Sequence, residues 1–252
     1  MTNEVMMDSY RVSERLKKVA EWIERGNVVA DIGTDHGYLP IYIVKQNISD
    51  KVIAMDVRKG PLNKAYENVQ ASGTGGCIDI RLSDGLARLN ENEASTITIC
   101  GMGGPLIQSI LEKGKDKYNQ NTQLIVSPQS EIREFRKFLY TNGFEIKRQT
   151  MLKEDRQFYL IIDCRKTAHQ NTNSCEWGNN AIFKEISLRY GKSLLEERNK
   201  CLYDYLKKEQ KIAENVYNTV SKLKTDDNAV LHRINQLKFD MECIEQALTY
   251  YK

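Results

Sequence analysis

The stretch VVADIGTDHG, residues 28–37, decides the fold class of this 252-residue chain. Residues 28–30 are apolar, as expected of a buried strand, and the apolar run 39–44 that follows is typical of a helix. Gly33 and Gly37 lie in the turn between them. Glycines there let the backbone approach a ligand, and the helix N-terminus offers free N–H groups. This order of elements indicates the nucleotide pocket of an α/β protein, although the Gly-x-Gly-x-x-Gly spacing of dinucleotide enzymes is absent.

The same alternation continues outward from this turn. Strands are predicted over residues 27–32, 51–56, 77–82, 95–100 and 122–127, with helices between them over 38–46, 61–71, 105–113 and 131–141. Strands separated by helices of this length predict a parallel, doubly wound sheet. Residues 144–151 and 157–163 predict an antiparallel strand pair at the edge of the sheet. Apolar residues at 12, 16, 19, 20 and 23 share one helical face, which predicts an N-terminal helix over residues 8–24.

The chain changes character after the strand pair. The polar stretch 167–174 lacks periodicity, so we divide the chain into a first domain, residues 1–166, and a helical domain, residues 167–252. In the second domain, apolar residues alternate in steps of four and three at 230, 234, 237, 241, 244, 248 and 251. A less regular seam precedes it at 195, 202, 205, 212, 216 and 223, and residues 225–228 form a turn between the two. This pattern predicts an antiparallel helical hairpin of the coiled-coil type.

The composition excludes several classes of protein. The net charge is only +3, and residues 1–164 carry 22 basic and 22 acidic side chains, so the chain lacks the strongly basic character of a nucleic-acid coat protein. Six scattered cysteines without a Cys-x-x-Cys pair, and three distant histidines, predict reduced thiols and no metal site. No apolar run is long enough to cross a bilayer, so we expect no membrane partner.

Acidic and glycine residues follow several of the predicted strands. Asp56 ends the second strand, where a carboxylate could accept two hydrogen bonds from a ribose or could instead cap the helix near Pro61. Asp84 lies in the run Ser-Asp-Gly after the third strand, where it could contact a ligand or could instead belong to an ordinary Asp-Gly turn. The run GMGG, residues 101–104, follows the fourth strand. Three glycines in four residues predict a close approach of the backbone to a ligand or to another segment. Ligands of such sheets bind at the carboxyl ends of the strands, where these residues are expected to meet.

Five stretches together resemble a known family: SERL at 13–16, ADIGTDHGYLP at 30–40, SDGL at 83–86, ITICGMGG at 97–104, and Glu-Asp at 154–155. They resemble the TrmK family, bacterial methyltransferases that use S-adenosyl-L-methionine (SAM) to modify N1 of adenine 22 in the D-arm of tRNA. The resemblance implies a class I SAM-dependent methyltransferase, with a Rossmann-like doubly wound sheet and a C-terminal coiled-coil hairpin. It further implies SAM as cofactor, tRNA as partner, a cytoplasmic location, and a monomer or a weak dimer through the coiled coil.

The resemblance also implies which residues form the site. The cofactor would contact Asp31, Gly33, Asp35, His36, Asp56, Val57, Asp84, Gly85, Gly101, Met102 and Gly103. Within this set Asp31 and Gly33 would hold the methionine end, Asp56 the ribose and Asp84 the adenine. Candidates for catalysis are Asp31, Asp35, His36 and Tyr38, and no general base is assigned. A local role is the alternative for two of them: a hydrogen bond at the helix start for His36, and an N-cap for Asp35, which its position favours.

The candidate tRNA contacts are an arginine near the N-terminus, an aromatic residue for base stacking, and basic residues on three predicted helices. They are Arg15, Tyr38, Lys113, Lys115, Lys117, Arg133, Arg136, Lys207, Lys208 and Lys211. The alternative for each cluster of basic residues is a solvated helix face.

Three other functions stay open at this point. An NAD-type oxidoreductase is disfavoured by the missing dinucleotide fingerprint. A non-enzymatic RNA-binding scaffold with a vestigial pocket is disfavoured by the intact acids at three strand ends. A SAM methyltransferase acting on another RNA site is the third. An Asn/Asp-Pro-Pro-aromatic segment is absent after the fourth strand, which argues against methylation of an exocyclic amine.

Overall fold

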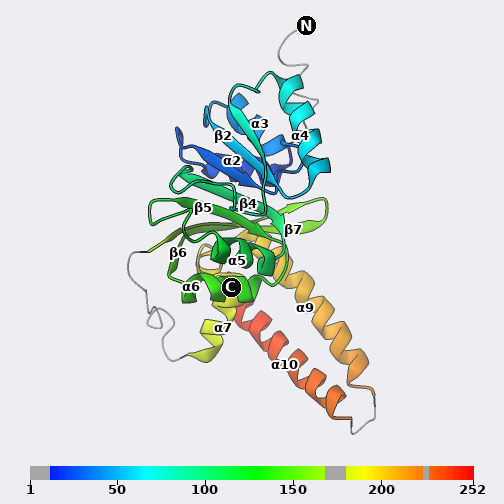
Figure 1. The fold of residues 1–252 in the computed structure, drawn as a ribbon. Helices are drawn as coiled ribbons and strands as arrows, with labels where there is room; N and C mark the ends of the chain where they lie inside the picture. Colours follow the sequence, from blue (N-terminus) through cyan, green and yellow to red (C-terminus); the bar gives the residue numbers. More distant parts are fainter. Residues whose placement is uncertain (1–11, 168–179, 224–226) are drawn as a thin grey trace.

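A seven-stranded sheet forms the centre of the molecule, in the order β3-β2-β1-β4-β5-β7-β6 (Figure 1). The structure, a computed structural model, describes residues 12–167, 180–223 and 227–252. The first five strands are parallel, and β7 runs antiparallel to both β5 and β6. Because β1 lies between β2 and β4, the chain reverses its winding direction beside β1, which is where sheets of this type bind ligands.

All seven strands lie where the alternation of the sequence predicts them. Their bounds are Val29–Ile32 for β1, Val52–Asp56 for β2, Ile78–Leu82 for β3, Thr96–Met102 for β4, Gln123–Pro128 for β5, Phe144–Glu154 for β6 and Gln157–Lys166 for β7. The last two strands are longer than expected and pair along most of their length, from Phe144 opposite Lys166 to Glu154 opposite Gln157. The predicted doubly wound sheet with an antiparallel edge is confirmed.

Helices cover both faces of the sheet. They are α2 (Glu14–Trp22), α3 (Tyr38–Lys45), α4 (Lys59–Ser72), α5 (Gly104–Lys113) and α6 (Ile132–Thr141). Alternate strand residues point to opposite faces: Val29 lies in one hydrophobic cluster with Val19 and Leu39, whereas Ala30 lies in the other with Ile107 and Phe135. Each strand of the centre is therefore buried on both sides, which explains its nearly continuous apolar sequence.

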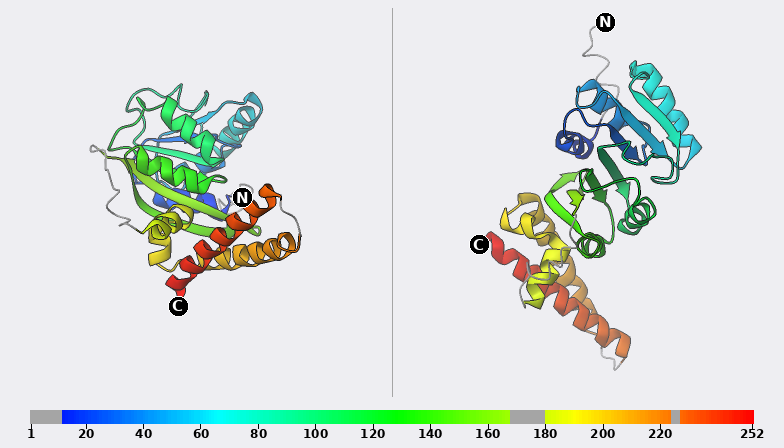
Figure 2. Two further views of the ribbon diagram at one scale, coloured as in Figure 1. Left: turned by 90° about the horizontal axis from the view of Figure 1, so that it is seen from below. Right: turned by 60° about the vertical axis from the view of Figure 1, so that its left-hand side comes forward.

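After β7, residues 180–223 and 227–252 form four α-helices and one turn of 3-10 helix, η1 (Thr249–Tyr251); the sequence indicated only the last two α-helices. The α-helices are α7 (Ala181–Tyr190), α8 (Lys192–Glu196), α9 (Lys200–Val220) and α10 (Asn228–Leu248). The long helices α9 and α10 lie side by side and extend away from the sheet (Figures 1 and 2). At their attached end, Leu202, Leu206 and Ile244 belong to the same hydrophobic cluster as the strand residues. The hairpin is therefore anchored on the sheet through a shared core.

The predicted seam of α10 is at least half-buried throughout, but the seam of α9 is partly wrong. Ile212 is 46% exposed, and Leu223, which lies beyond the end of the helix, is 55% exposed. Leu206 and Ala213 are buried instead. The part of α9 nearest the sheet packs on β6 as well as on α10. Its buried face therefore differs from the face that would be buried if α9 packed against α10 alone.

Some expectations fall outside the described residues. They concern residues 8–11 of the N-terminal helix, residues 168–174 of the predicted boundary, the turn residues 225–226, and Cys175. The described part of the N-terminal helix begins after Ser13, whose hydroxyl accepts the N–H of Leu16 at 3.2 Å. Among the described residues, no helix combines the length and the apolar character that crossing a bilayer requires.

Candidate functional site

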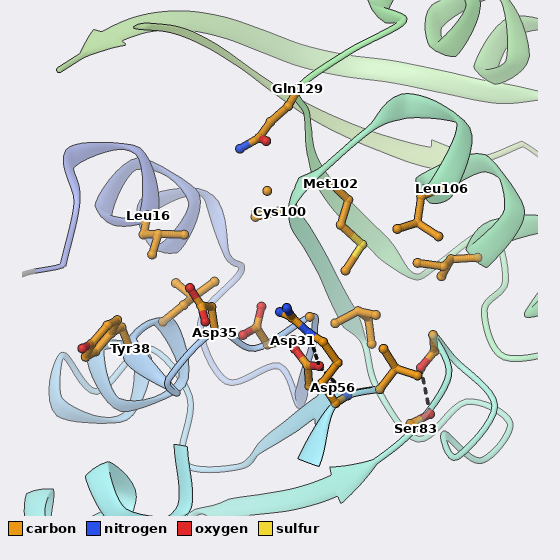
Figure 3. Close-up of a pocket in the computed structure, with 18 of the residues that line it drawn as sticks. Leu16, Asp31, Asp35, Tyr38, Asp56, Ser83, Cys100, Met102, Leu106 and Gln129 are labelled. Carbon is orange, nitrogen blue, oxygen red and sulfur yellow. Dashed lines mark hydrogen bonds and ion pairs between the residues drawn. The ribbon is translucent and has the colours of Figure 1, made fainter. Parts of the chain in front are cut away.

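A cavity of about 450 Å³ opens at the carboxyl ends of the parallel strands (Figure 3). It receives residues from the ends of β1, β2, β4 and β5, from the loop after β3, and from the N-terminal helix α2. Predicted site residues that line it are Asp31, Gly33, Asp35, Asp56, Val57, Asp84, Gly85, Gly101, Met102, Arg15 and Tyr38. Residues separated by more than a hundred positions along the chain therefore meet at one edge of the sheet.

The end of β1 places a buried acid at the base of the cavity. Asp31 is 5% exposed, and its carboxylate accepts a hydrogen bond from the hydroxyl of Thr98 at 2.7 Å. Burial raises the pKa of Asp31 to about 6, and the hydrogen bond from Thr98 offsets part of this effect. Gly33 has φ +76°, a left-handed backbone conformation that side-chain-bearing residues rarely adopt, and it faces the terminal methyl of Met102. The turn after β1 therefore requires glycine for its conformation.

The end of β2 places a second acid beside the first. Asp56 is 4% exposed, and one carboxylate oxygen accepts the backbone N–H of Arg58 at 2.8 Å. The N-cap of α4 is Arg58, which has no side-chain cap, so Asp56 closes a local turn and does not cap the helix itself. Val57 is 61% exposed at the rim of the cavity. The acid is thus held in a fixed orientation toward the ligand space.

The loop after β3 forms a structured turn around Asp84. The hydroxyl of Ser83 donates to the carbonyl of Gly85 at 2.9 Å and accepts the N–H of Arg88 at 3.1 Å. Gly85 has φ +54°, and a β-carbon there would lie 3.0 Å from Ile110. The Asp-Gly turn that was an alternative to a binding role is therefore present, and it also presents Asp84 to the cavity.

The glycines after β4 serve two purposes. Gly101 has φ +79° and lines the cavity. At Gly103 a β-carbon would lie 2.8 Å from the hydroxyl of Ser130, and at Gly104 it would lie 2.7 Å from the carbonyl oxygen of Ser130. Gly103, a predicted cofactor contact, is not among the lining residues. The last two glycines thus allow close packing of the loop after β5.

The turn between β1 and α3 differs from expectation. Gly37, with φ +73°, is the N-cap of α3, and no side chain caps the helix, so the predicted N-cap role of Asp35 is wrong. The Asp35 side chain is 72% exposed at the edge of the cavity. His36 does not line the cavity: its ring stacks on Tyr38 with centroids 5.6 Å apart, and its Nε2 lies 3.4 Å from Asp35. The His36 ring is thus engaged locally with Tyr38 and Asp35, but its buried Nδ1 makes no hydrogen bond to a described residue, so the expected local hydrogen bond is not confirmed.

Arg15 of α2 reaches the cavity with an incomplete set of partners. Its guanidinium lies 4.8 Å above the ring of Tyr159. Its Nε and Nη1 atoms are buried and, within the described part of the chain, make no hydrogen bond. Buried N–H donors without acceptors are rare in folded proteins. The orphaned donors therefore indicate that an anionic or carbonyl group belongs beside them.

Several lining residues were not predicted from the sequence. They are Leu16, Ile32, Leu39, Arg58, Ser83, Cys100, Leu106, Ile110 and Gln129. Burial raises the pKa of the Cys100 thiol to about 12, so it stays protonated and behaves as an apolar wall. Gln129 directly follows β5, and this position after a strand end was the signal that could have identified it.

The predicted basic residues divide into free and engaged groups. Arg136 is fully buried, and its guanidinium donates to Gln149 at 2.9 Å and to the carbonyls of Leu188 and Arg189. The prediction that Arg136 contacts tRNA is therefore wrong, because the side chain caps the end of α7 inside the protein. Arg133 is paired with Glu185 at 2.7 Å.

The lysine candidates are on the surface. Lys113 and Lys117 border a smaller cavity of about 110 Å³ that adjoins Asp84, and Lys117 is paired with Asp116 at 2.7 Å. Lys207, Lys208 and Lys211 are exposed along α9, together with Lys115 beside α5. Among the described residues, no cluster of histidine, cysteine, aspartate or glutamate has the arrangement of a metal site.

Comparison with known proteins gives consistent findings. Residues 12–162 match the family model described as a methyltransferase domain. A tRNA (adenine(22)-N(1))-methyltransferase of Bacillus subtilis is 31% identical over 97% of this chain and 100% of its own length. The crystal structure of the B. subtilis M1A22 tRNA methyltransferase TrmK superposes with a TM-score of 0.83 at 30% identity, covering 95% of this chain and 99% of that one. M. capricolum TrmK in complex with S-adenosyl-homocysteine superposes with a TM-score of 0.72 at 27% identity, covering 92% and 99%.

Proposed function

This chain belongs to the methyltransferase family of the tRNA (adenine(22)-N(1))-methyltransferases, and on that premise we propose its reaction and the roles of its residues. It transfers the methyl group of SAM to N1 of adenine 22 in tRNA. The observation that carries this function is the cavity at the carboxyl edge of the sheet, where two buried acids and the orphaned donors of Arg15 face one ligand space.

The groups around the cavity fit the functional groups of SAM. Asp56 can accept hydrogen bonds from both ribose hydroxyls, and Asp84 can accept from the adenine amino group. Among the residues that the structure describes, Asp31 has no cationic partner, and the buried Nε and Nη1 of Arg15 have no acceptor. The amino-acid end of SAM carries one ammonium and one carboxylate, so a single ligand group satisfies both residues.

The chemistry makes few demands on the protein. Bound SAM supplies a methyl group activated by the neighbouring sulfonium. Because the lone pair of adenine N1 lies in the ring plane and carries no proton, the protein needs no general base and acts mainly by alignment. Met102, Leu106 and the protonated Cys100 present apolar groups to the ligand space. The exposed carboxylate of Asp35, at the edge of the cavity, can stabilise the positive charge of the methylated base.

The tRNA must present an unpaired or flipped base, since N1 faces the pairing partner in a duplex. Tyr38, at the rim, is placed to contact this base. Lys113, Lys115, Lys117, Lys207, Lys208 and Lys211 remain candidate phosphate contacts, and Arg133 is a weaker one because Glu185 neutralises it. We keep as further proposals a cytoplasmic location, the division of the chain at residue 167, and a monomer or weak dimer through the hairpin.

A direct test uses the full chain and unmodified tRNA transcripts with SAM. Methylation of N1 blocks base pairing, so reverse transcription should stop at position 22 after incubation, and a transcript with guanine at position 22 should show no stop. Calorimetry should register SAM binding and no binding of NADH. SAM binding without any tRNA product would favour the scaffold, and a stop at another position would favour a different RNA site.

A further inference from the structure

Gln129 is an uncharged polar residue of the cavity lining to which the proposed reaction gives no role. It directly follows β5, and its backbone N–H donates to the carbonyl of Met102 at 2.9 Å. This bond fixes its position beside the end of β4. Figure 3 shows its side chain above Cys100 and Met102 on the upper border of the cavity. A β-carbon placed on Gly101 would lie 3.8 Å from Nη1 of Arg15 and 3.9 Å from Nε2 of Gln129, so the two polar ends flank this glycine.

The loop that carries Gln129 is held tightly against the glycines after β4. The N–H of Gly104 donates to the carbonyl of Ser130 at 3.1 Å, and the approach is so close that a β-carbon at Gly103 or Gly104 would collide with Ser130. In contrast to its backbone, the Gln129 carboxamide makes no hydrogen bond to any described residue, and the residue is exposed. The fold therefore presents an amide oxygen and an amide NH₂ group from a fixed backbone.

Adenine offers glutamine two bidentate edges. On either edge the carboxamide oxygen accepts from N6–H, while the carboxamide nitrogen donates to N1 on the pairing edge or to N7 on the major-groove edge. A donor on N1 would occupy the lone pair that has to form the new bond. A glutamine that assists methylation of N1 must therefore use the N6–N7 edge. Guanine presents acceptors at both O6 and N7, so it cannot pair with both halves of the carboxamide.

We propose that Gln129 is a specificity-determining residue, which binds the N6–N7 edge of the target adenine and leaves N1 free to face the methyl donor. This inference rests on the proposed function and deepens it by assigning the protein group that distinguishes adenine from guanine. Gly103 and Gly104 act as positioning residues, because their missing side chains let the loop of Gln129 approach.

The test compares adenine with 7-deazaadenine at the target position of a tRNA transcript. Replacing N7 with carbon removes the proposed acceptor, while N6 and the N1 lone pair remain. For the wild-type protein, kcat/KM should fall about tenfold to hundredfold, the discrimination expected of one bidentate contact. Gln129→Met should lose a similar factor on adenine and show no additional loss on 7-deazaadenine, because the variant cannot make the contact with either base.

Two controls isolate the contact. Gln120→Ala changes an exposed glutamine that precedes β5, at the opposite edge of the sheet, and should leave both substrates unaffected. The SAM dissociation constant of Gln129→Met, measured by calorimetry, should equal that of the wild type, whereas a distorted cavity would raise it. Two results would overturn the assignment of Gln129 and leave the proposed function intact. One is equal kcat/KM of the wild type on adenine and 7-deazaadenine. The other is a Gln129→Met variant that loses a further factor of kcat/KM when adenine is replaced with 7-deazaadenine. Failure of the wild type to methylate adenine would reject the proposed function and this inference together.

Discussion

Two of the regions that bury charged side chains do so in opposite ways. At the junction between the sheet and the C-terminal helices, Arg136 donates to Gln149 and to backbone carbonyls at the end of α7. At the cavity, Arg15 buries two nitrogens that no described residue accepts from, and the pKa of Asp31 is raised by burial. Both regions contain an arginine on a helix beside the sheet. Among the described residues, the guanidinium of Arg136 has hydrogen-bond acceptors, whereas Nε and Nη1 of Arg15 have none.

The difference in hydrogen bonding between the two arginines distinguishes a structural role from a binding role. Burying a polar group costs free energy unless a partner replaces the lost water. Near the junction the charged groups find partners within the protein, since Arg133, Glu185, Arg189 and Asp240 form a continuous chain of ion pairs across α6, α7 and α10. In the cavity Asp31 and Asp56 accept hydrogen bonds from Thr98 and from the N–H of Arg58, but the buried Nε and Nη1 of Arg15 have no acceptor among the described residues. For the two arginines, hydrogen-bonded burial therefore marks the region that holds the hairpin on the sheet, and burial without an acceptor among the described residues marks the site. Ser187 Oγ on α7 and Asp163 Oδ1 on β7 are also buried without a partner among these residues, so the contrast holds for the arginines and is not a general rule.

The largest expected effect tests the junction. Arg136→Met leaves several buried carbonyl groups without donors, so it should lower the free energy of unfolding by about 3–5 kcal/mol. Arg15→Met, the matched change at the cavity, should cost about 1 kcal/mol or less, because it removes only the stacking on Tyr159. Urea unfolding of both variants measures the contrast. Equal losses of stability would show that the two arginines have the same structural role.

A stabilising substitution tests the cavity. The pKa of Asp31 lies at about 6 in the folded protein and near 3.8 in the unfolded chain, so the folded state binds the proton more tightly. Its ionised form therefore destabilises the fold, and the cost grows as pH rises from about 4 to 6. Asp31→Asn should stabilise the protein by about 2–3 kcal/mol at pH 8, with little difference at pH 4. The same variant should bind SAM more weakly. Unchanged stability at pH 8 would contradict the claim that the ionised carboxylate of Asp31 destabilises the fold.

Removing the proposed ribose contact should weaken SAM binding. Asp56→Ala should weaken SAM binding about tenfold to hundredfold, as expected when charge-assisted hydrogen bonds worth about 1.5–3 kcal/mol are removed. Calorimetry measures the affinity. Asp79→Ala removes an exposed acid on β3 that pairs with Arg81 outside the cavity, and it should leave the affinity unchanged. Equal effects of the two variants would remove Asp56 from the site.

The smallest expected effect concerns the hairpin. Replacing Lys207, Lys208 and Lys211 together with serine should weaken tRNA binding severalfold at low salt. It should also reduce the slope of log K against log salt by about one unit for each lysine–phosphate ion pair that the substitution removes. Lys64→Ser on α4, whose ammonium is paired with Glu67, serves as the control. An unchanged slope would leave α9 as a solvated helix face that does not touch tRNA.

The doubly wound sheet and the acids at the strand ends were accessible from the sequence because they depend on local pattern. Alternation of apolar strands and helices defines a doubly wound sheet, and residues that follow parallel strands must gather at one edge. Asp31, Asp56 and Asp84 could therefore be assigned together. Gln129 follows the same rule, but its sequence neighbourhood lacks a glycine turn or an acid to distinguish it.

The remaining features depend on distances that no local pattern encodes. The helix pattern placed Arg136 on a basic face with Arg133. In the structure α7 packs against α6, and Arg136 is buried. Gly103 was predicted to contact the cofactor, but the close approach of Ser130 is what accounts for a glycine at this position. Likewise, contact with β6 decided which side of α9 is buried. The sequence by itself thus determined the sheet, its binding edge and the acids there, since periodicity and strand ends are local properties. Only the tertiary structure decided which arginine is satisfied, because its partners come from segments about fifty residues away along the chain.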